Sequence, residues 1–253
     1  MRPLLAAPEN PVGYDPGTMG DMRHRVLACD YDGTIANEGI CSPTTIASLE
    51  RIAATGMRLI LVTGRTREEL ESVFDHSSLF SALVVENGSV VIDADGGETL
   101  LAPRLPRRLV EELERIGVTP LVIGRVLCST SVTQTAKLSA AIAKLGIDRA
   151  IVLNRASAMV IPPGTSKRTG VEVALRSIGE TPSSMVAIGD GENDVALFAV
   201  AGVSVAVANA VAVLKARADV VLTKPNGQGF ADLVDALITG DLGALTALSP
   251  LAG

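Results

Sequence analysis

The sequence contains few aromatic residues: there is no Trp, and only two Tyr and four Phe occur among 253 residues. Proteins that bind nucleic acids commonly stack bases on aromatic rings and contact phosphates through clustered Lys and Arg. Here 28 acidic residues outnumber 22 basic ones, which gives a net charge of −6. We therefore expect no nucleic-acid partner and no binding to an anionic membrane surface.

Cysteine is scarce as well, and long apolar runs are absent. The three cysteines are Cys29, Cys41 and Cys128. Their odd number and wide separation fit neither a disulfide framework nor a zinc knuckle. No apolar run approaches the roughly 18 residues that a membrane-spanning helix needs, and the apolar segment at the start is too short for a secretory signal. These absences predict a cytoplasmic protein with no membrane partner.

What the sequence does contain is an alternation of apolar stretches of strand length with amphipathic stretches of helix length. This alternation predicts an α/β fold, with a Rossmann-like doubly wound parallel sheet covered by helices on both faces. The expected core strands are residues 25–29, 57–62, 82–85, 184–188, 203–207 and 219–222. The expected core helices are residues 44–55, 67–74, 167–178, 192–199 and 229–238.

The pattern changes after residue 88, where two apolar segments flank a turn sequence at residues 95–97 and predict an antiparallel hairpin. We expect this hairpin to begin a small inserted α+β cap domain, an open sheet with helices on one side. Its other expected elements are helices at 106–116 and 132–145 and strands at 120–126, 150–153 and 158–161. The predicted domains are a disordered extension at 1–22, in which Met19 or Met22 is an alternative start, a core at 23–88 and 163–240, a cap at 89–162 and a C-terminal tail at 241–253. Because ligands bind at the carboxyl edge of parallel sheets, the cap is expected to cover the active site.

Four expected core strands end in polar residues that a buried sheet does not need. Asp30 and Asp32 follow the first strand, and Thr63-Gly64-Arg65 follows the second. Glu86-Asn87-Gly88, which we interpret as a turn into the cap, follows the third, and residues 189–194 follow the fourth. Because parallel strands end at the same edge of a sheet, we expect these segments to converge on one site.

The acidic residues of these segments predict a metal site. Asp30 and Asp32 place two like charges close together, which is unfavourable unless a cation or a shared proton lies between them. Asp190 and Asp194 add two carboxylates, and no His or Cys lies in the same segments. An all-oxygen set of this kind favours Mg2+ over Zn2+.

Other residues of these segments are suited to hold phosphate. Thr63, together with the Gly64 N–H beside an expected helix start, can bind phosphate oxygens. Lys167 adds a positive charge at the start of the helix that follows the insertion. With Mg2+ neutralising the charge of a transferring phosphoryl group, the set predicts phosphoryl chemistry.

The segments resemble the signature of the haloacid dehalogenase-like hydrolase superfamily, and specifically its subgroup with a type IIB cap, which is similar to Cof-like, phosphoglycolate and sugar phosphatases. The resemblance spans roughly residues 25–240. It rests on Asp30-Tyr31-Asp32-Gly33-Thr34, Thr63-Gly64-Arg65, Lys167 within residues 163–167, and residues 189–194, in that order. It implies a Mg2+-dependent phosphatase that hydrolyses a small soluble phosphomonoester, either a phosphosugar or a phosphoglycolate-like compound.

The resemblance also implies a role for each residue. Asp30 attacks phosphorus to form an aspartyl-phosphate, while Asp32 protonates the leaving oxygen and then activates water. The implied phosphate-binding residues are Thr63, Gly64, Lys167 and Asn193. The implied metal ligands are Asp30, the backbone carbonyl of Asp32, Asp190 and Asp194. Asp194 acts either through a water molecule or by orienting Lys167.

Some alternatives stay open at this point. The candidates for substrate recognition are Arg65 near the phosphate, and Arg125 and Arg155 in the cap, for which a solvated or structural role is the alternative. A phosphomutase of the same superfamily and a catalytically idle phosphate- or metal-binding protein are alternative functions. A phosphotransfer receiver domain is disfavoured, because it has no insertion of this size and does not carry its acceptor and acidic pair on one strand. The sequence names neither the particular phosphomonoester nor an oligomeric state.

Overall fold

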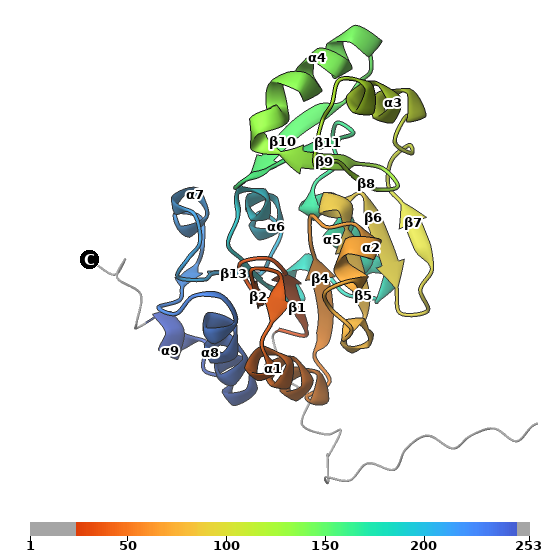
Figure 1. Cartoon of the computed structure of the whole chain (residues 1–253). Coiled ribbons are helices and arrows are strands. Elements are labelled where there is room, and N and C mark those ends of the chain that lie inside the picture. Colours follow the sequence, from red (N-terminus) through yellow and green to blue (C-terminus); the bar gives the residue numbers. More distant parts are fainter. Residues whose placement is uncertain (1–23, 247–253) are drawn as a thin grey trace, which may run out of the picture.

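The computed structural model describes residues 24–246, so the expected extension at 1–22 and residues 247–253 of the expected tail lie outside the described part. The described chain has a larger core, built around an eight-stranded sheet, and a smaller cap with a four-stranded sheet that lies over one edge of the core (Figure 1). Within residues 24–246, no helix has the length and apolar character needed to cross a membrane.

The core sheet has the strand order β14-β13-β12-β1-β4-β5-β6-β7. Its strands are β1 (Val26–Asp30), β4 (Arg58–Val62), β5 (Ala82–Val85), β6 (Val90–Asp93), β7 (Glu98–Leu100), β12 (Met185–Gly189), β13 (Val203–Ala206) and β14 (Val220–Val221). The first six in this order are parallel to one another. The predicted α/β fold with a parallel core sheet is therefore confirmed, and each expected core strand is present to within one residue at either end.

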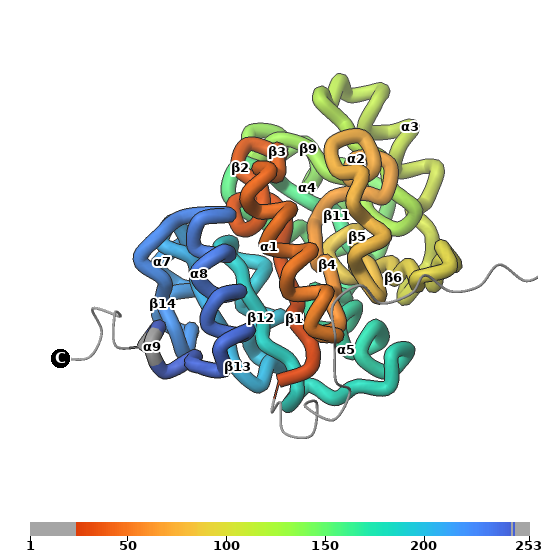
Figure 2. Tube along the Cα trace, turned by 90° about the horizontal axis from the view of Figure 1, so that it is seen from below, coloured from red at the N-terminus to blue at the C-terminus, as the bar shows by residue number. Residues whose placement is uncertain are grey.

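Helices cover both faces of this sheet (Figure 2). Helices α1 (Pro43–Ala54) and α8 (Asn226–Thr239) lie side by side on one face, whereas α5 (Lys167–Ser177) and α6 (Val195–Phe198) pack together on the other. The remaining core helices are α2 (Arg67–Glu71), α7 (Ala212–Lys215) and α9 (Gly243–Thr246), of which α9 lies within the expected tail. Short 3₁₀ helices are η2 (Ser77–Leu79), η3 (Glu86–Gly88), η4 (Val132–Gln134), η5 (Pro182–Ser184) and η6 (Glu192–Asp194).

Local sequence explains where the helices beside the site begin. The Ser42 hydroxyl accepts a hydrogen bond from the Thr45 N–H, and Pro43 occupies the first turn of α1, where no N–H is needed. Helix α2 begins with a capping box in which Thr66 and Glu69 each accept the other's N–H. Helix α2 ends at Glu71, three residues before the expected end.

The hairpin of β6 and β7 belongs to the core sheet and not to the cap, so the predicted boundary at residue 89 is wrong for these strands. The turn η3 reverses the chain, and β6 pairs antiparallel with β5. Val90, Val91 and Ile92 of β6 are buried. Strand β7 then pairs with β6 at the edge of the sheet. The turn sequence specifies a hairpin but not the sheet that it joins, because that choice depends on which edge strand is free to pair.

The cap is an antiparallel sheet with two helices on one face. Its elements are α3 (Arg107–Arg115), β8 (Val122–Ile123), β9 (Cys128–Ser131), α4 (Thr135–Leu145), β10 (Ala150–Asn154) and β11 (Ser157–Ile161), with the strand order β10-β11-β9-β8. Leu109 and Leu113 of α3 and Leu138 of α4 pack on Ala158 and Val160 of the sheet. The expected strand at 120–126 is replaced by β8 and a turn, and β9 was not predicted. The opposite face of this sheet is turned toward the core (Figure 1).

Helix α5 packs unusually close to the turn η3 through two glycines. A Cβ atom at Gly170 would lie 2.3 Å from Val84 Cγ1 and 2.7 Å from the Gly88 Cα. We expect Gly170→Ala to lower the free energy of unfolding by about 1–3 kcal/mol, because overpacking outweighs the gain of about 1 kcal/mol in helix propensity. Urea unfolding measures this, with Arg176→Ala at an exposed position of the same helix as control. A Gly170→Ala protein as stable as wild type would contradict the close packing.

Candidate active site

The site lies at the carboxyl ends of three adjacent strands. Strand β1 is paired with β4 on one side and β12 on the other. Asp30 is the last residue of β1, Thr63 directly follows β4, and Asp190 directly follows β12. The expected convergence of these segments on one edge therefore occurs, and the cap lies above it (Figure 1).

Three buried carboxylates form the centre of the site. Asp30, Asp190 and Asp194 each offer an oxygen, and these oxygens lie within 4.8 Å of one another. Asp194 Oδ2 accepts the N–H groups of Asp190, at 3.0 Å, and of Gly191, at 2.9 Å, so it fixes the loop that follows β12. Three of the four predicted metal-binding residues are thus brought together.

The charge of this cluster is only partly balanced. Lys167 has a fully buried side chain, and its Nζ contacts both Asp30 and Asp194, the latter at 2.6 Å. Burial disfavours the charged amine, but the charges of Asp194 and Asp30 outweigh it and raise the pKa of Lys167, so the amine stays protonated. Lys167 contacts two of the three carboxylates, so this residue, predicted to bind phosphate, is also a structural counter-ion.

The excess of negative charge appears in the carboxylates themselves. Burial raises the pKa of Asp30 well above its usual range, the charge of Asp194 raises it further, and Lys167 offsets this only in part. Burial and the charge of Asp194 also raise the pKa of Asp190. A hard divalent cation relieves such repulsion and prefers carboxylate oxygens, so these residues fit Mg2+.

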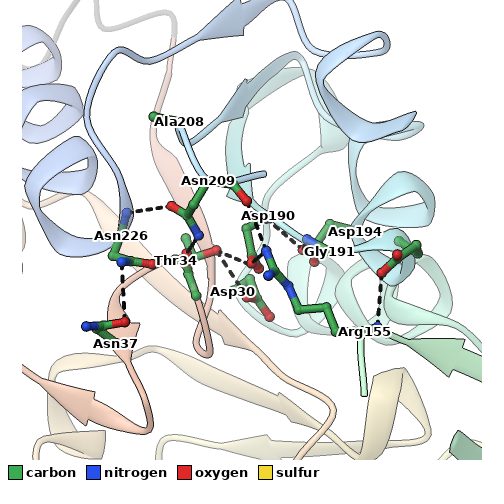
Figure 3. A network of polar contacts seen from close by, with 12 residues as sticks. Asp30, Thr34, Asn37, Arg155, Asp190, Gly191, Asp194, Ala208, Asn209 and Asn226 are labelled. Atoms are coloured by element: carbon green, nitrogen blue, oxygen red, sulfur yellow. Dashed lines mark hydrogen bonds and ion pairs between the residues drawn. The ribbon is translucent and has the colours of Figure 1, made fainter. Parts of the chain in front are cut away.

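Thr34 and Gly33 support the cluster from the loop after β1. The Thr34 hydroxyl lies 3.1 Å from Asp30 Oδ2 and 3.3 Å from Asp190 Oδ1, and so links the two carboxylates (Figure 3). A Cβ atom at Gly33 would lie 2.2 Å from Asp190 Oδ2, and its φ of +81° is one that side chains rarely adopt. Only glycine therefore fits beside Asp190.

The side chain of Asp32 is turned away from the cluster. Arg65 binds both of its oxygens at 2.7 Å, and the Asp32 side chain is 46% exposed. The Arg65 guanidinium also lies over the Tyr31 ring, 5.4 Å from its centroid, and the Arg65 N–H donates to the Thr63 hydroxyl at 3.2 Å. Asp32 can thus transfer protons at the edge of the cluster, but its carboxylate does not join the three-carboxylate set.

A cavity of about 400 Å³ separates this floor from the cap. Its core side is lined by Asp30, Asp32, Thr63, Gly64, Arg65, Glu69 and Asn193. Its cap side is lined by Pro120, Ser129, Thr130, Ser131, Asn154, Arg155, Ala156, Ser157 and Met159. Among the predicted core residues, Lys167, Asp190 and Asp194 lie outside this lining, whereas Asp30, Asp32 and Thr63 face the cavity.

Sequence reasoning missed the hydroxyl-bearing residues of the cap. Ser129 and Ser131 of β9 and Ser157 of β11 alternate with buried residues that pack on the cap helices. This period of two is the signal that could have identified them, but β9 has four residues and no large apolar side chain. Asn154 was missed too: its Oδ1 and that of Asn193 are buried without a hydrogen-bond partner.

The two cap arginines differ in position. Arg125 lies outside the cavity lining and pairs with Glu68 at 2.8 Å and Glu98 at 3.3 Å, both on the core. Arg155 lines the cavity and its guanidinium contacts Asp190. The structure thus brings Arg155 to the site, and places Arg125 in a structural contact between cap and core.

Glu86 ties the cap to the core. Its buried carboxylate accepts the N–H groups of Arg125, Val126 and Leu127 at 2.7, 2.8 and 3.1 Å. A Cβ atom at Gly124 would lie 2.5 Å from this carboxylate, so the cap turn is shaped around it. These contacts explain why the expected strand at 120–126 is interrupted: the backbone donors of this turn bind Glu86 and not a neighbouring strand.

We expect Glu86→Ala to destabilise the protein by about 2–4 kcal/mol, because it leaves buried N–H groups without an acceptor. Glu68→Ala is the control: its side chain is 56% exposed and its pairing with Arg125 contributes at most about 1 kcal/mol. Urea unfolding of both variants measures the difference. Equal stabilities of the two variants would show that Glu86 does not anchor the cap.

With this geometry in place, comparison with known proteins identifies the family. The chain matches the haloacid dehalogenase-like hydrolases over residues 27–119 and 120–234, and it belongs to this family. Phosphoglycolate phosphatase 2 of Saccharolobus solfataricus is 29% identical, and the match covers 86% of this chain and 94% of that protein. Phosphoglycolate phosphatase of Nitrosopumilus maritimus is 30% identical, with coverages of 85% and 97%.

Solved structures agree on the fold. A haloacid dehalogenase-like hydrolase from Bacteroides thetaiotaomicron superposes with a TM-score of 0.70 at 21% identity, covering 85% of this chain and 99% of that one. A sugar phosphatase of subclass IIB superposes with a TM-score of 0.67 at 20% identity, covering 86% and 100%. The predicted family and the predicted enzyme class, a phosphatase of this family, are therefore confirmed.

Proposed function

We propose that the protein is a Mg2+-dependent phosphatase that hydrolyses a small phosphorylated acid of the phosphoglycolate type through an aspartyl-phosphate on Asp30. The observation that carries this proposal is the position of Asp30. Its carboxylate lies at the floor of the cavity, within one cluster with Asp190, Asp194 and Lys167. Nucleophile, metal-binding carboxylates and a fixed positive charge therefore share one site.

The residues around Asp30 orient it for attack. Lys167 holds Oδ1, and the Thr34 hydroxyl donates to Oδ2. Asp30, Asp190 and Asp194 would hold Mg2+, which when bound neutralises charge on the phosphoryl group. An Asp30 oxygen then forms a bond to phosphorus while the ester P–O bond breaks, and the leaving oxygen takes a proton from Asp32.

In the second half of the reaction Asp32 takes a proton from water, whose oxygen attacks phosphorus and releases inorganic phosphate and Asp30. Asp32 faces the cavity, as this role requires. Arg65 holds both oxygens of Asp32, so it must release one of them before Asp32 can take up a proton there. Thr63 and Asn193 face the same cavity and are proposed to bind the phosphoryl oxygens.

The size and lining of the cavity support a small leaving group. About 400 Å³ has to hold both the phosphoryl group and the rest of the substrate. The cap contributes serine and threonine hydroxyls, one amide and a single cation to the lining of this space. The curated relatives above are named phosphoglycolate phosphatases, which favours an acidic leaving group over a sugar.

The test is release of inorganic phosphate with Mg2+ from phosphoglycolate, glycerol phosphate and glucose 6-phosphate. We expect the highest kcat/KM with phosphoglycolate. Hydrolysis of the sugar phosphate alone would contradict the proposed substrate class. Activity that requires a sugar bisphosphate activator would point to a phosphomutase.

A further inference from the structure

Arg155 is the point at which the cap touches the carboxylate cluster of the core. It lies at the tip of the β10–β11 hairpin with φ at +51°, a conformation that costs energy for a residue other than glycine. Its guanidinium contacts Asp190 Oδ2 and donates to the Asn209 carbonyl at 3.1 Å, and its backbone N–H donates to Glu192 at 3.2 Å (Figure 3). The hairpin tip is thus placed so that its arginine reaches Asp190.

The two cations that contact the cluster are held differently. The Lys167 side chain is fully buried, whereas the Arg155 side chain is 43% exposed and belongs to the other part of the molecule. Asp190 itself is 2% exposed. Arg155 can therefore leave Asp190 by moving into solvent-accessible space, whereas Lys167 is part of the core.

Both oxygens of Asp190 already have partners in this arrangement. Oδ1 lies 3.3 Å from the Thr34 hydroxyl, which it shares with Asp30, and Oδ2 contacts Arg155. A divalent cation bound to Asp190 would lie within a few ångströms of the guanidinium, and like charges at that distance repel each other. Mg2+ and Arg155 therefore compete for the same carboxylate.

A released Arg155 still faces the cavity. The other arginine in the cavity lining, Arg65, is occupied by both oxygens of Asp32. The remaining cap residues that line the cavity are uncharged. Arg155 is thus the cap cation that can bind an anionic substrate group once Mg2+ occupies Asp190.

We propose that Arg155 exchanges partners: it holds Asp190 in the metal-free protein and, when Mg2+ takes Asp190, it binds the carboxylate of the leaving group. The second half of this exchange rests on the proposed function, whereas the first half does not. Two consequences follow. Arg155 opposes Mg2+ binding in the absence of substrate, and it favours phosphorylated acids over esters whose leaving group is uncharged.

The first consequence is tested by isothermal titration of Mg2+ into the full-length, EDTA-treated protein without substrate. We expect R155Q to bind Mg2+ roughly tenfold more tightly than wild type, because no ion pair has to be broken. R125Q is the matched control, since Arg125 also joins the cap to core carboxylates but does not contact Asp190, and we expect its affinity to equal that of wild type. An R155Q affinity equal to or weaker than wild type overturns the exchange, as does an equal gain in R125Q.

The second consequence is tested by the ratio of kcat/KM for phosphoglycolate to that for p-nitrophenyl phosphate. We expect this ratio to fall at least about tenfold in R155Q and to stay at the wild-type value in R125Q. An unchanged ratio in R155Q overturns the assignment of Arg155 to the leaving group. If wild type hydrolyses neither ester, the proposed function fails, but the calorimetry still shows whether Mg2+ and Arg155 compete for Asp190. If wild type binds no Mg2+, the proposed function and the exchange of Arg155 both fail.

Discussion

Asp30→Asn is expected to lower kcat by at least about 10⁴-fold, because the amide cannot form the covalent intermediate. The change is nearly isosteric, so the packing around β1 is retained. It also removes one of three crowded negative charges and one of the two partners of Lys167. We therefore expect a folded, inactive protein and not an unfolded one.

Phosphate release at saturating substrate measures this loss, and circular dichroism checks the fold. Asp75→Asn is the matched control, because Asp75 is an exposed aspartate whose carboxylate contacts His76, far in sequence from the cluster residues. Its activity is expected to equal that of wild type. If Asp30→Asn retains more than about a tenth of wild-type activity, Asp30 is not the nucleophile.

The second large effect is expected on metal removal. EDTA should abolish activity and added Mg2+ should restore it, because the two cations that contact the three buried carboxylates, Lys167 and Arg155, leave one negative charge unbalanced in the metal-free site. Binding to the folded state alone also stabilises it, by about 2.7 kcal/mol at a ligand concentration 100 times the dissociation constant. For a protein of this size we expect Tm to rise by roughly 5–10 °C with Mg2+.

Asp190→Asn tests whether this stabilisation arises at the proposed site. Asp190 is buried, lies in the cluster and follows β12 directly. The Mg2+-dependent rise in Tm is expected to shrink to about 2 °C or less in this variant, whereas Asp75→Asn should keep the full rise. A full rise in Asp190→Asn would place the metal elsewhere.

The sequence predicted those features that depend on local pattern and on the geometry of parallel sheets. Buried runs such as Leu59–Val62 predict strands, and caps such as Ser42 mark where helices begin. Asp30 and Asp190 lie far apart in the sequence, yet their convergence could be expected, because parallel strands end at one edge of the sheet.

The sequence does not show which strand another strand pairs with, or which side chain a given arginine contacts, so these features could not be predicted. The β6–β7 hairpin joins the core because β5 leaves a free edge, which the turn sequence does not reveal. Arg125 and Arg155 were equal candidates in sequence, and only the fold of the cap separates them. The turn around Glu86 directs Arg125 to Glu68, and the tip of the β10–β11 hairpin directs Arg155 to Asp190.

The ion pair between Asp32 and Arg65 could not be predicted from the sequence either. Spacing placed Asp32 beside Asp30 and suggested a shared metal site. In the structure the two side chains have different partners. Arg65 binds both oxygens of Asp32, whereas Lys167 and Thr34 contact the oxygens of Asp30. The division of roles between the two aspartates therefore has a physical basis in their different partners.

In the proposed reaction the phosphoryl group passes through Asp30. This step is tested most directly by rapid acid quenching of the protein during turnover with Mg2+ and substrate, followed by peptide mass spectrometry. We expect one phosphoryl group on the Asp30 carboxylate, in the peptide of residues 26–51, and a higher level of it in Asp32→Asn, in which water attack is slowed. Turnover with no phosphorylated peptide, or with the phosphoryl group on another residue, would contradict it.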